Sequence, residues 1–167
     1  LSEMANIIIS QDYIGSVMKQ AWDEEMDAED DDDDDAQNVC FGITTALNMS
    51  SRKNRECIQQ LQKFILEKAE KNSDDNALKL LKDILSTDSQ TIGFILNERY
   101  INIPAPISVP MLGNLCKEIK RATEKNKPYN FSYYIMILKF YRKEEKDGKP
   151  KEDVFSNPEE ELFFKES

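Results

Sequence analysis

Apolar residues recur along this chain at two spacings, which predict two kinds of element. Steps of three and four residues place apolar side chains on one face of a helix. They predict helices over residues 1–12, 54–71 and 75–86, and a fourth helix beginning at Ser108. Denser apolar and β-branched runs predict strands over residues 13–22, 39–49, 91–103 and 131–143.

Local signals refine these elements. Asp74 or Asp75 can cap the helix over residues 75–86, and Asp147-Gly148 predicts a turn that closes the last strand. Asn157-Pro158 followed by three glutamates predicts one more helix, with a cap, a first-position proline and an acidic first turn. The alternation of strands and helices indicates an α/β fold, a layered mixed sheet with helices packed on it.

The helix from Ser108 is expected to present a basic surface. Its apolar stripe predicts a face turned toward the core, formed by Met111, Leu112, Leu115, Ile119 and Ala122. The opposite side carries Lys117, Lys120, Arg121, Lys125 and Lys127. Residues 99–151 together have a net charge of +7, so weak and salt-sensitive nucleic-acid binding is compatible with the sequence.

Length and composition limit the classes of protein to which this chain can belong. A chain of 167 residues is long enough for one domain with a real core. No window has the roughly 18 consecutive apolar residues of a membrane helix, so no membrane association is expected. Three cysteines without any CxxC spacing fit a reducing compartment, and Cys57 and Cys116 are expected to be buried as small apolar side chains.

The residues that most enzymes need are missing. Histidine is absent, which removes the usual general base, the serine and cysteine triads and the commonest nitrogen ligand for metals. Only five glycines occur, and none forms a phosphate or dinucleotide cradle. We therefore predict a protein that is not an enzyme, with no metal, no cofactor and no small-molecule substrate.

Negative charge is concentrated in one run of thirteen residues, which contains eleven carboxylates and no lysine or arginine. So many like charges with almost no apolar surface predict a disordered loop over residues 23–38, inserted between two strands of the domain. An EF-hand is excluded, because Asp35 and Phe41 stand where that loop needs Gly and Glu. The run either binds basic partners or only aids solubility. Its candidate partner-binding residues are Asp23, Glu24, Glu25, Asp27, Glu29, Asp30, Asp31, Asp32, Asp33, Asp34 and Asp35.

Several segments, in order along the chain, resemble one known family. They are QDYIGSVMKQ at 11–20, CFGITTALNM at 40–49, GFILNERYINIPAPISVPML at 93–112, NKPYNFSYYIMI at 126–137 and EEELFF at 159–164. Together they look like the BCCIP family of animals and its fungal counterpart. The most specific match is a string formed by Gly93, Phe94, Leu96, Glu98, Arg99, Ile101, Asn102 and Pro104, for which a core strand is still the favoured structural role.

The resemblance implies a fold similar to that of the GNAT acetyltransferases without their activity, since their acetyl-CoA loop is not found here. It implies a single BCCIP-type domain over residues 1–167, lacking the family's first strand and its C-terminal segments. It further implies a nuclear protein that shuttles to the cytoplasm and escorts a basic ribosomal protein during ribosome assembly and export. The alternative role is an adaptor for a recombination-mediator tumour suppressor and the p21 cyclin-dependent kinase inhibitor, through a sheet edge or helical groove.

Overall fold

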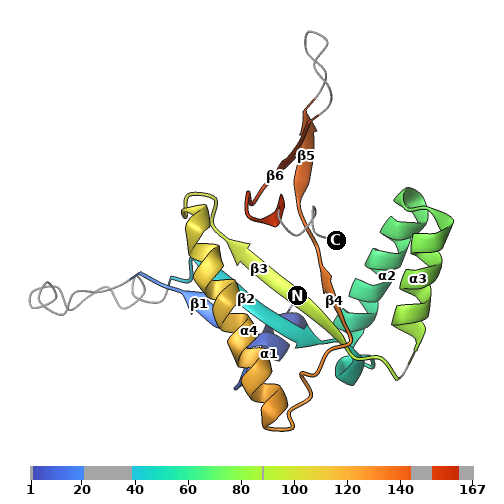
Figure 1. The fold of residues 1–167 in the computed structure, drawn as a ribbon, viewed down its shortest axis with the longest axis horizontal. Helices are drawn as coiled ribbons and strands as arrows, with labels where there is room; N and C mark the ends of the chain where they lie inside the picture. Colours follow the sequence, from blue (N-terminus) through green and yellow to red (C-terminus); the bar gives the residue numbers. More distant parts are fainter. Residues whose placement is uncertain (1, 21–38, 88, 144–151, 162–167) are drawn as a thin grey trace, which may run out of the picture.

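Four strands form the central sheet of the computed structural model, which describes residues 2–20, 39–87, 89–143 and 152–161. Figure 1 shows them side by side in the order β1 (Ser16–Met18), β2 (Gly42–Asn48), β3 (Ile92–Arg99) and β4 (Tyr133–Met136). β2 is antiparallel to both β1 and β3, whereas β4 is parallel to β3. The sheet is therefore mixed, and the predicted α/β class is confirmed.

Three helices belong to one face of this sheet. They are α1 (Ser2–Ile9), α2 (Glu56–Asn72) and α3 (Asp75–Ser86), and their apolar stripes meet alternate residues of β2 and β3. The buried members of this cluster are Ile7, Leu47, Met49, Ile58, Ile92 and Phe94. This is the larger of the two apolar clusters, and it accounts for the amphipathic pattern of the first three helices.

The opposite face is covered by α4 (Ser108–Glu124), which connects the parallel strands β3 and β4 (Figure 1). A parallel pair needs such a crossover, because the chain must return to the same end of the sheet. The buried residues of this second cluster are Ile14, Ala46, Leu115, Ala122 and Tyr129. The domain thus has a three-layer core with helices on both sides of the sheet.

Two element ends depend on hydrogen bonds in turns. The side chain of Asp74 accepts a hydrogen bond of 2.8 Å from the Ala77 N–H, so the predicted cap of α3 is confirmed. β3 ends at Arg99 and not at residue 103, because the Ile103 N–H donates to the Tyr100 carbonyl in a turn ahead of Pro104. The predicted strand over residues 91–103 was therefore too long.

The predicted strand over residues 131–143 was wrong in its continuity. Only β4 belongs to the sheet, and the chain then leaves it to form β5 (Phe140–Lys143), which pairs with β6 (Glu152–Phe155) in a separate hairpin (Figure 1). The Phe140 and Phe155 rings lie 5.7 Å apart, and Arg142 Nε donates to Asp153 Oδ1 at 2.7 Å. Cross-strand contacts of this kind stabilise a strand as short as β6, which its own sequence did not predict.

Some predictions fall outside the described residues, namely the disordered loop over residues 23–38 and the turn at Asp147-Gly148. Of the helix predicted from Asn157, residues 160–161 are helical, and the residues after them are not described. None of the described helices is long and apolar enough to cross a membrane.

Candidate protein-binding site

An apolar groove lies between α4 and the edge of the sheet at β4. It encloses about 620 Å³ and is lined by Ile95, Leu112, Leu115, Cys116, Ile119, Tyr134, Met136 and Leu138. One wall comes from the helix, the other from β4 and the residues after it, and Ile95 of β3 lies between them. Concave apolar surfaces of this size are typical binding sites for side chains of a partner or for small ligands.

The helical wall carries an exposed cysteine. Leu112, Leu115, Cys116 and Ile119 follow the spacing of one helix face, but only Leu115 is fully buried. The prediction that Cys116 is buried was wrong, because the strand that lies beyond it, β4, is the last one that the described part of the sheet contains and leaves the groove open. Cys57 is half-buried, and burial raises the pKa of its thiol.

Gly113 lies in the middle of α4, where a glycine weakens a helix because it adds backbone entropy to the unfolded chain. A Cβ at this position meets no other atom within 4 Å. We therefore expect Gly113→Ala to raise the free energy of unfolding by about 0.5–1 kcal/mol, measured by urea denaturation. An unchanged or lower stability would show that Gly113 has a role that the open space does not reveal.

β4 offers an open backbone edge as well as side chains. The Tyr133 N–H donates to the Thr91 carbonyl on the β3 side, at 3.2 Å. Because successive residues of a strand alternate, the N–H and C=O groups of Tyr134 and Met136 point to the other side. Within the described residues no strand pairs with that side. The Tyr134 ring contacts Phe131 at 5.4 Å, and partial burial, with the nearby Cys116, raises the pKa of its hydroxyl.

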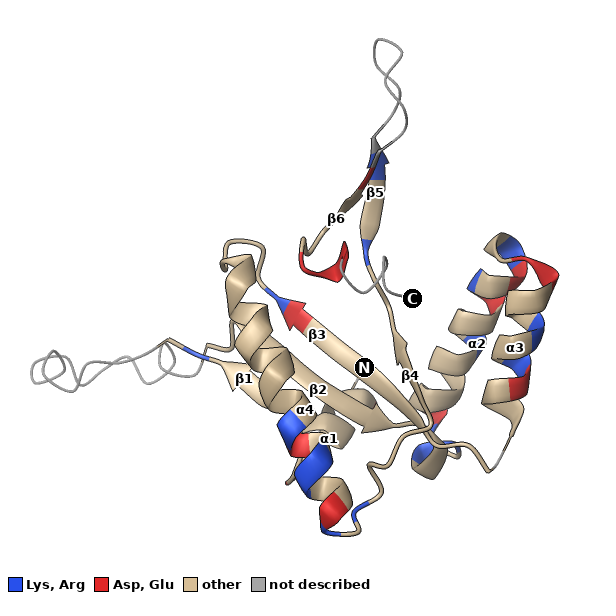
Figure 2. Ribbon diagram, in the orientation of Figure 1, with Lys and Arg blue, Asp and Glu red and all other residues tan. Residues whose placement is uncertain are grey.

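A basic surface adjoins the groove on α4. Lys117, Lys120 and Arg121 surround a shallow depression to which Glu124 contributes the one acidic side chain. Figure 2 shows these charges on the C-terminal half of the helix, while the half next to β3's end has none. The predicted basic surface of this helix is confirmed for these residues.

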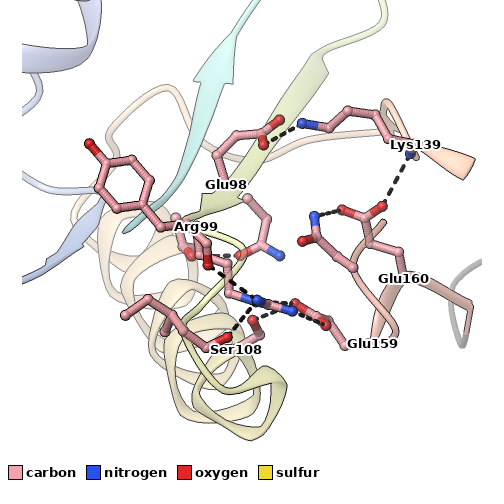
Figure 3. A network of polar contacts seen from close by, with 11 residues as sticks. Glu98, Arg99, Ser108, Lys139, Glu159 and Glu160 are labelled. Atoms are coloured by element: carbon pink, nitrogen blue, oxygen red, sulfur yellow. Dashed lines mark hydrogen bonds and ion pairs between the residues drawn. The ribbon is translucent and has the colours of Figure 1, made fainter. Parts of the chain in front are cut away.

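A nearly buried ion pair lies where β3 ends and α4 begins (Figure 3). Arg99, at the end of β3, donates from Nε and Nη2 to the two carboxylate oxygens of Glu159, at 3.1 and 3.2 Å. Their side chains are only 6% and 8% exposed. The Ser108 hydroxyl donates to Glu159 Oε1 at 2.6 Å, so the start of α4 joins the same cluster. The end of β3 and the start of α4 are thereby tied to Glu159, which lies more than 50 residues further along the chain.

A second carboxylate secures the turn after β6. Glu160 is 1% exposed and accepts hydrogen bonds from the Asn157 side chain at 2.6 Å and the Lys139 backbone N–H at 3.2 Å. The Lys139 side chain forms an ion pair with Glu98, as Figure 3 shows. These contacts fix the C-terminal hairpin to the end of β3. Glu98 and Arg99, the polar end of the family string, therefore have a structural role.

Acid should weaken the Arg99–Glu159 contact. Burial by itself raises the pKa of Glu159, but hydrogen bonds from Arg99 and Ser108 outweigh it, so this pKa lies below its usual value of 4.5. A carboxylate with a lowered folded-state pKa stabilises the fold above the unfolded-state pKa and loses that effect as pH falls through the folded value. We expect the stability difference between the unaltered chain and Glu159→Gln to shrink below about pH 4.5 in urea titrations. A constant difference from pH 7 to pH 3 would contradict this.

Comparison with known proteins gives these features a context. A family model described as BCCIP matches residues 1–164. The chain belongs to the BCCIP family. A BCCIP homolog of Drosophila melanogaster is 44% identical over 164 residues, which cover 97% of this chain and 55% of the relative. The bovine BRCA2 and CDKN1A-interacting protein is 34% identical and Protein BCP1 of Gibberella zeae 30%, over 99% and 85% of this chain and 56% and 44% of those relatives.

The names within the BCCIP family describe interacting proteins and not enzymes. The chain spans about half the length of the curated relatives that it matches, so what those proteins bind as a whole is not transferred directly. The GNAT-like fold implied by the resemblance stays a prediction, as does the prediction of a single domain over residues 1–167.

The predicted partner-binding residues, Asp23 to Asp35, lie outside the described residues, so their role stays a prediction. Among the described residues, no group of three carboxylate or cysteine side chains is placed to hold a metal ion. A sheet edge or helical groove was predicted from the sequence in general terms, without the residues that form it. The apolar face of α4 was visible in the sequence. Nothing in the sequence indicated that β4 leaves part of that face uncovered.

Proposed function

We propose that this chain is a non-catalytic protein-binding module that escorts a strongly basic protein, such as a ribosomal protein, during ribosome assembly and nuclear export. The observation that carries this proposal is the run of eleven carboxylates without a cation between residues 23 and 35. We place the protein in the nucleus, with shuttling to the cytoplasm. In this role the acidic run shields lysine and arginine side chains until a nucleic-acid surface replaces it.

The negative charge of this run determines how it contributes to partner binding. Clustered like charges accelerate encounter with a partner of opposite charge and select coarsely for it, whereas shape supplies specificity. The attraction between exposed charges weakens as salt shortens the screening length from about 10 Å at 0.1 M. Binding of a basic ribosomal protein should therefore be steeply salt-dependent.

Replacing residues 23–35 by a Gly/Ser linker of equal length tests the escort role. We expect the affinity for a lysine-rich ribosomal protein to fall about tenfold or more at 0.1 M salt, and the difference to narrow at higher salt. Calorimetry over a salt series measures both effects. Unchanged binding would remove the acidic run from the site and leave it a role in solubility alone.

The second candidate role is an adaptor for nuclear regulators of the cell cycle and DNA repair. The groove between α4 and β4 supports it, because an apolar groove beside an open strand edge is a recurring way to bind an extended peptide. The names of mammalian relatives, which state interaction with BRCA2 and CDKN1A, also favour it. Binding of those two proteins to this chain is measured in the same assay, and the Gly/Ser variant should retain it.

A further inference from the structure

Three features meet at the corner formed by α4 and β4, namely the apolar groove, the open edge of β4 and the basic surface of α4. We propose that this corner binds an extended peptide segment of a partner protein, apolar at alternate positions and acidic at its end, as an added strand beside β4. This inference deepens the adaptor role and rests on it. It does not depend on the acidic run of residues 23–35.

The outer edge of β4 has backbone groups that an added strand can pair with. Tyr134 and Met136 direct their N–H and C=O groups away from β3, because Tyr133 directs its own N–H toward Thr91. An extended peptide alongside β4 pairs with these groups, and main-chain hydrogen bonds of this kind provide affinity without regard to sequence. An open edge with exposed aromatic residues is otherwise a site of nonspecific aggregation, which proteins avoid by covering it.

The side chains of Tyr134 and Met136 indicate which side chains the peptide should carry. Tyr134 and Met136 line the groove, so the face of the sheet on which they lie is the face that α4 covers only in part. A strand added next to β4 continues that face, and every second side chain of the peptide points toward the groove. The groove is apolar on both walls, since Leu112 and Ile119 oppose Met136 and Leu138. Aliphatic side chains at alternate positions are therefore the expected occupants.

The positive charge of α4 indicates that the peptide should carry acidic residues at its end. α4 begins beside the end of β3, and its C-terminal half lies near β4, because Cys116 and Ile119 line the same groove as Tyr134. That half carries Lys117, Lys120 and Arg121, of which Lys120 directly follows the groove residue Ile119. A peptide whose acidic residues flank its apolar positions is complementary in charge to this surface.

A second copy of the chain fits this corner less well. Pairing of two β4 edges about a two-fold axis brings the two α4 helices, and with them two basic surfaces, toward each other. Like charges at an interface disfavour association. A nucleic acid fits less well for a different reason: a chain of net charge −10 repels a polyanion, and phosphates could pair with the cations of α4 but not with the apolar groove.

A labelled nine-residue probe tests the proposal on the unaltered chain: Asp-Glu-Val-Thr-Ile-Thr-Val-Asp-Glu, acidic at both ends so that either strand direction is served. We expect saturable binding by fluorescence anisotropy. Three altered probes should each bind about tenfold more weakly or worse. In the first, lysine replaces the acidic residues; in the second, serine replaces the aliphatic ones; in the third, methyl groups block the backbone N–H groups on the β4 side.

A chemical readout locates the probe without any substitution. Cys116 is exposed in the groove, and Cys40 is exposed outside it. The probe should slow alkylation of Cys116 by iodoacetamide and leave alkylation of Cys40 unchanged. Equal protection of both cysteines, or of neither, at saturating probe would place the peptide elsewhere and overturn the proposal.

Matched charge variants test the basic surface. Reversing Lys117, Lys120 and Arg121 to glutamate should weaken the probe about tenfold or more, whereas reversing Lys68, Lys71 and Lys79 on α2 and α3 should have little effect. The two variants carry the same net charge, so a nonspecific charge effect would weaken both and contradict the proposal. Circular dichroism and thermal melting confirm that each variant is folded before binding is measured.

Three further outcomes would assign the corner to another occupant. Probe binding to this chain but not to the full-length Drosophila relative would show that the rest of the protein covers the corner. Tighter binding by the Gly/Ser variant of residues 23–35 would show that the chain's own acidic run competes for it. Displacement of the probe, with protection of Cys116, by an RNA oligonucleotide would favour nucleic acid. Unchanged binding by the Gly/Ser variant supports the peptide site even where the escort role has failed.

Discussion

Replacing Arg99 with alanine should lower the free energy of unfolding by about 3–5 kcal/mol. The substitution leaves the Glu159 carboxylate without its cation, with the Ser108 hydroxyl and its own backbone N–H as the remaining donors among the described residues. An unpaired buried charge costs more than the ion pair contributes, because its solvation in water is lost without compensation. Arg99 also donates to the Ile103 carbonyl at 2.6 Å, so the turn after β3 loses its anchor as well. Urea denaturation of the single variant measures the loss.

A combined variant separates the buried charge from the lost packing. Arg99→Met together with Glu159→Met and Ser108→Ala removes all the charged groups and the hydroxyl at once. Replacement of a buried ion pair by apolar side chains is often close to neutral, so this variant should regain most of the stability that Arg99→Ala loses. A loss as large as that of Arg99→Ala would show that the volume and shape of the ion pair matter more than its charge.

Phe94→Ala should destabilise the domain by a similar amount, about 3–5 kcal/mol. The Phe94 ring is 3% exposed and belongs to the cluster formed by β2, β3, α1 and α2. Truncation removes its burial and leaves a cavity, because a close-packed interior relaxes only in part around the lost ring. Thermal and urea unfolding measure the loss.

An exposed apolar residue of the same family string provides the control. Ile101 lies in the turn after β3 and is 91% exposed, so Ile101→Ala should change the stability by no more than about 0.5 kcal/mol. A large effect of Ile101→Ala together with a small effect of Phe94→Ala would contradict the placement of the string in the fold.

The two proposed binding surfaces have opposite charge, which makes them separable by experiment. The acidic run of residues 23–35 suits a basic partner, and the corner of α4 and β4 suits an acidic and apolar one. Salt weakens both, but only the second also depends on apolar side chains and on backbone pairing. A module with two such surfaces accommodates both of the roles considered for it.

Local sequence signals determined much of the fold. The helix predicted over residues 75–86 coincides with α3, because a capping aspartate and a complete apolar stripe act within a few residues of each other. The layered α/β class followed from the alternation of period-two and period-3.6 segments, and the basic surface of α4 followed from its stripe. Each of these properties depends on side chains that are near neighbours along the chain.

Only the tertiary structure decided where β4 stops and what lies beyond it. Residues 131–143 are mostly apolar and aromatic, but the Lys139 backbone bonds to Glu160 and Ser156 and not to β3, so the chain leaves the sheet. The partner of Arg99 is 60 residues away in sequence, and no local pattern pairs the two. The groove follows from the same event, since α4 faces an edge strand with no strand beyond it among the described residues. Periodicity specifies which face of an element is apolar, whereas long-range contacts determine which of those faces is covered and which remains open.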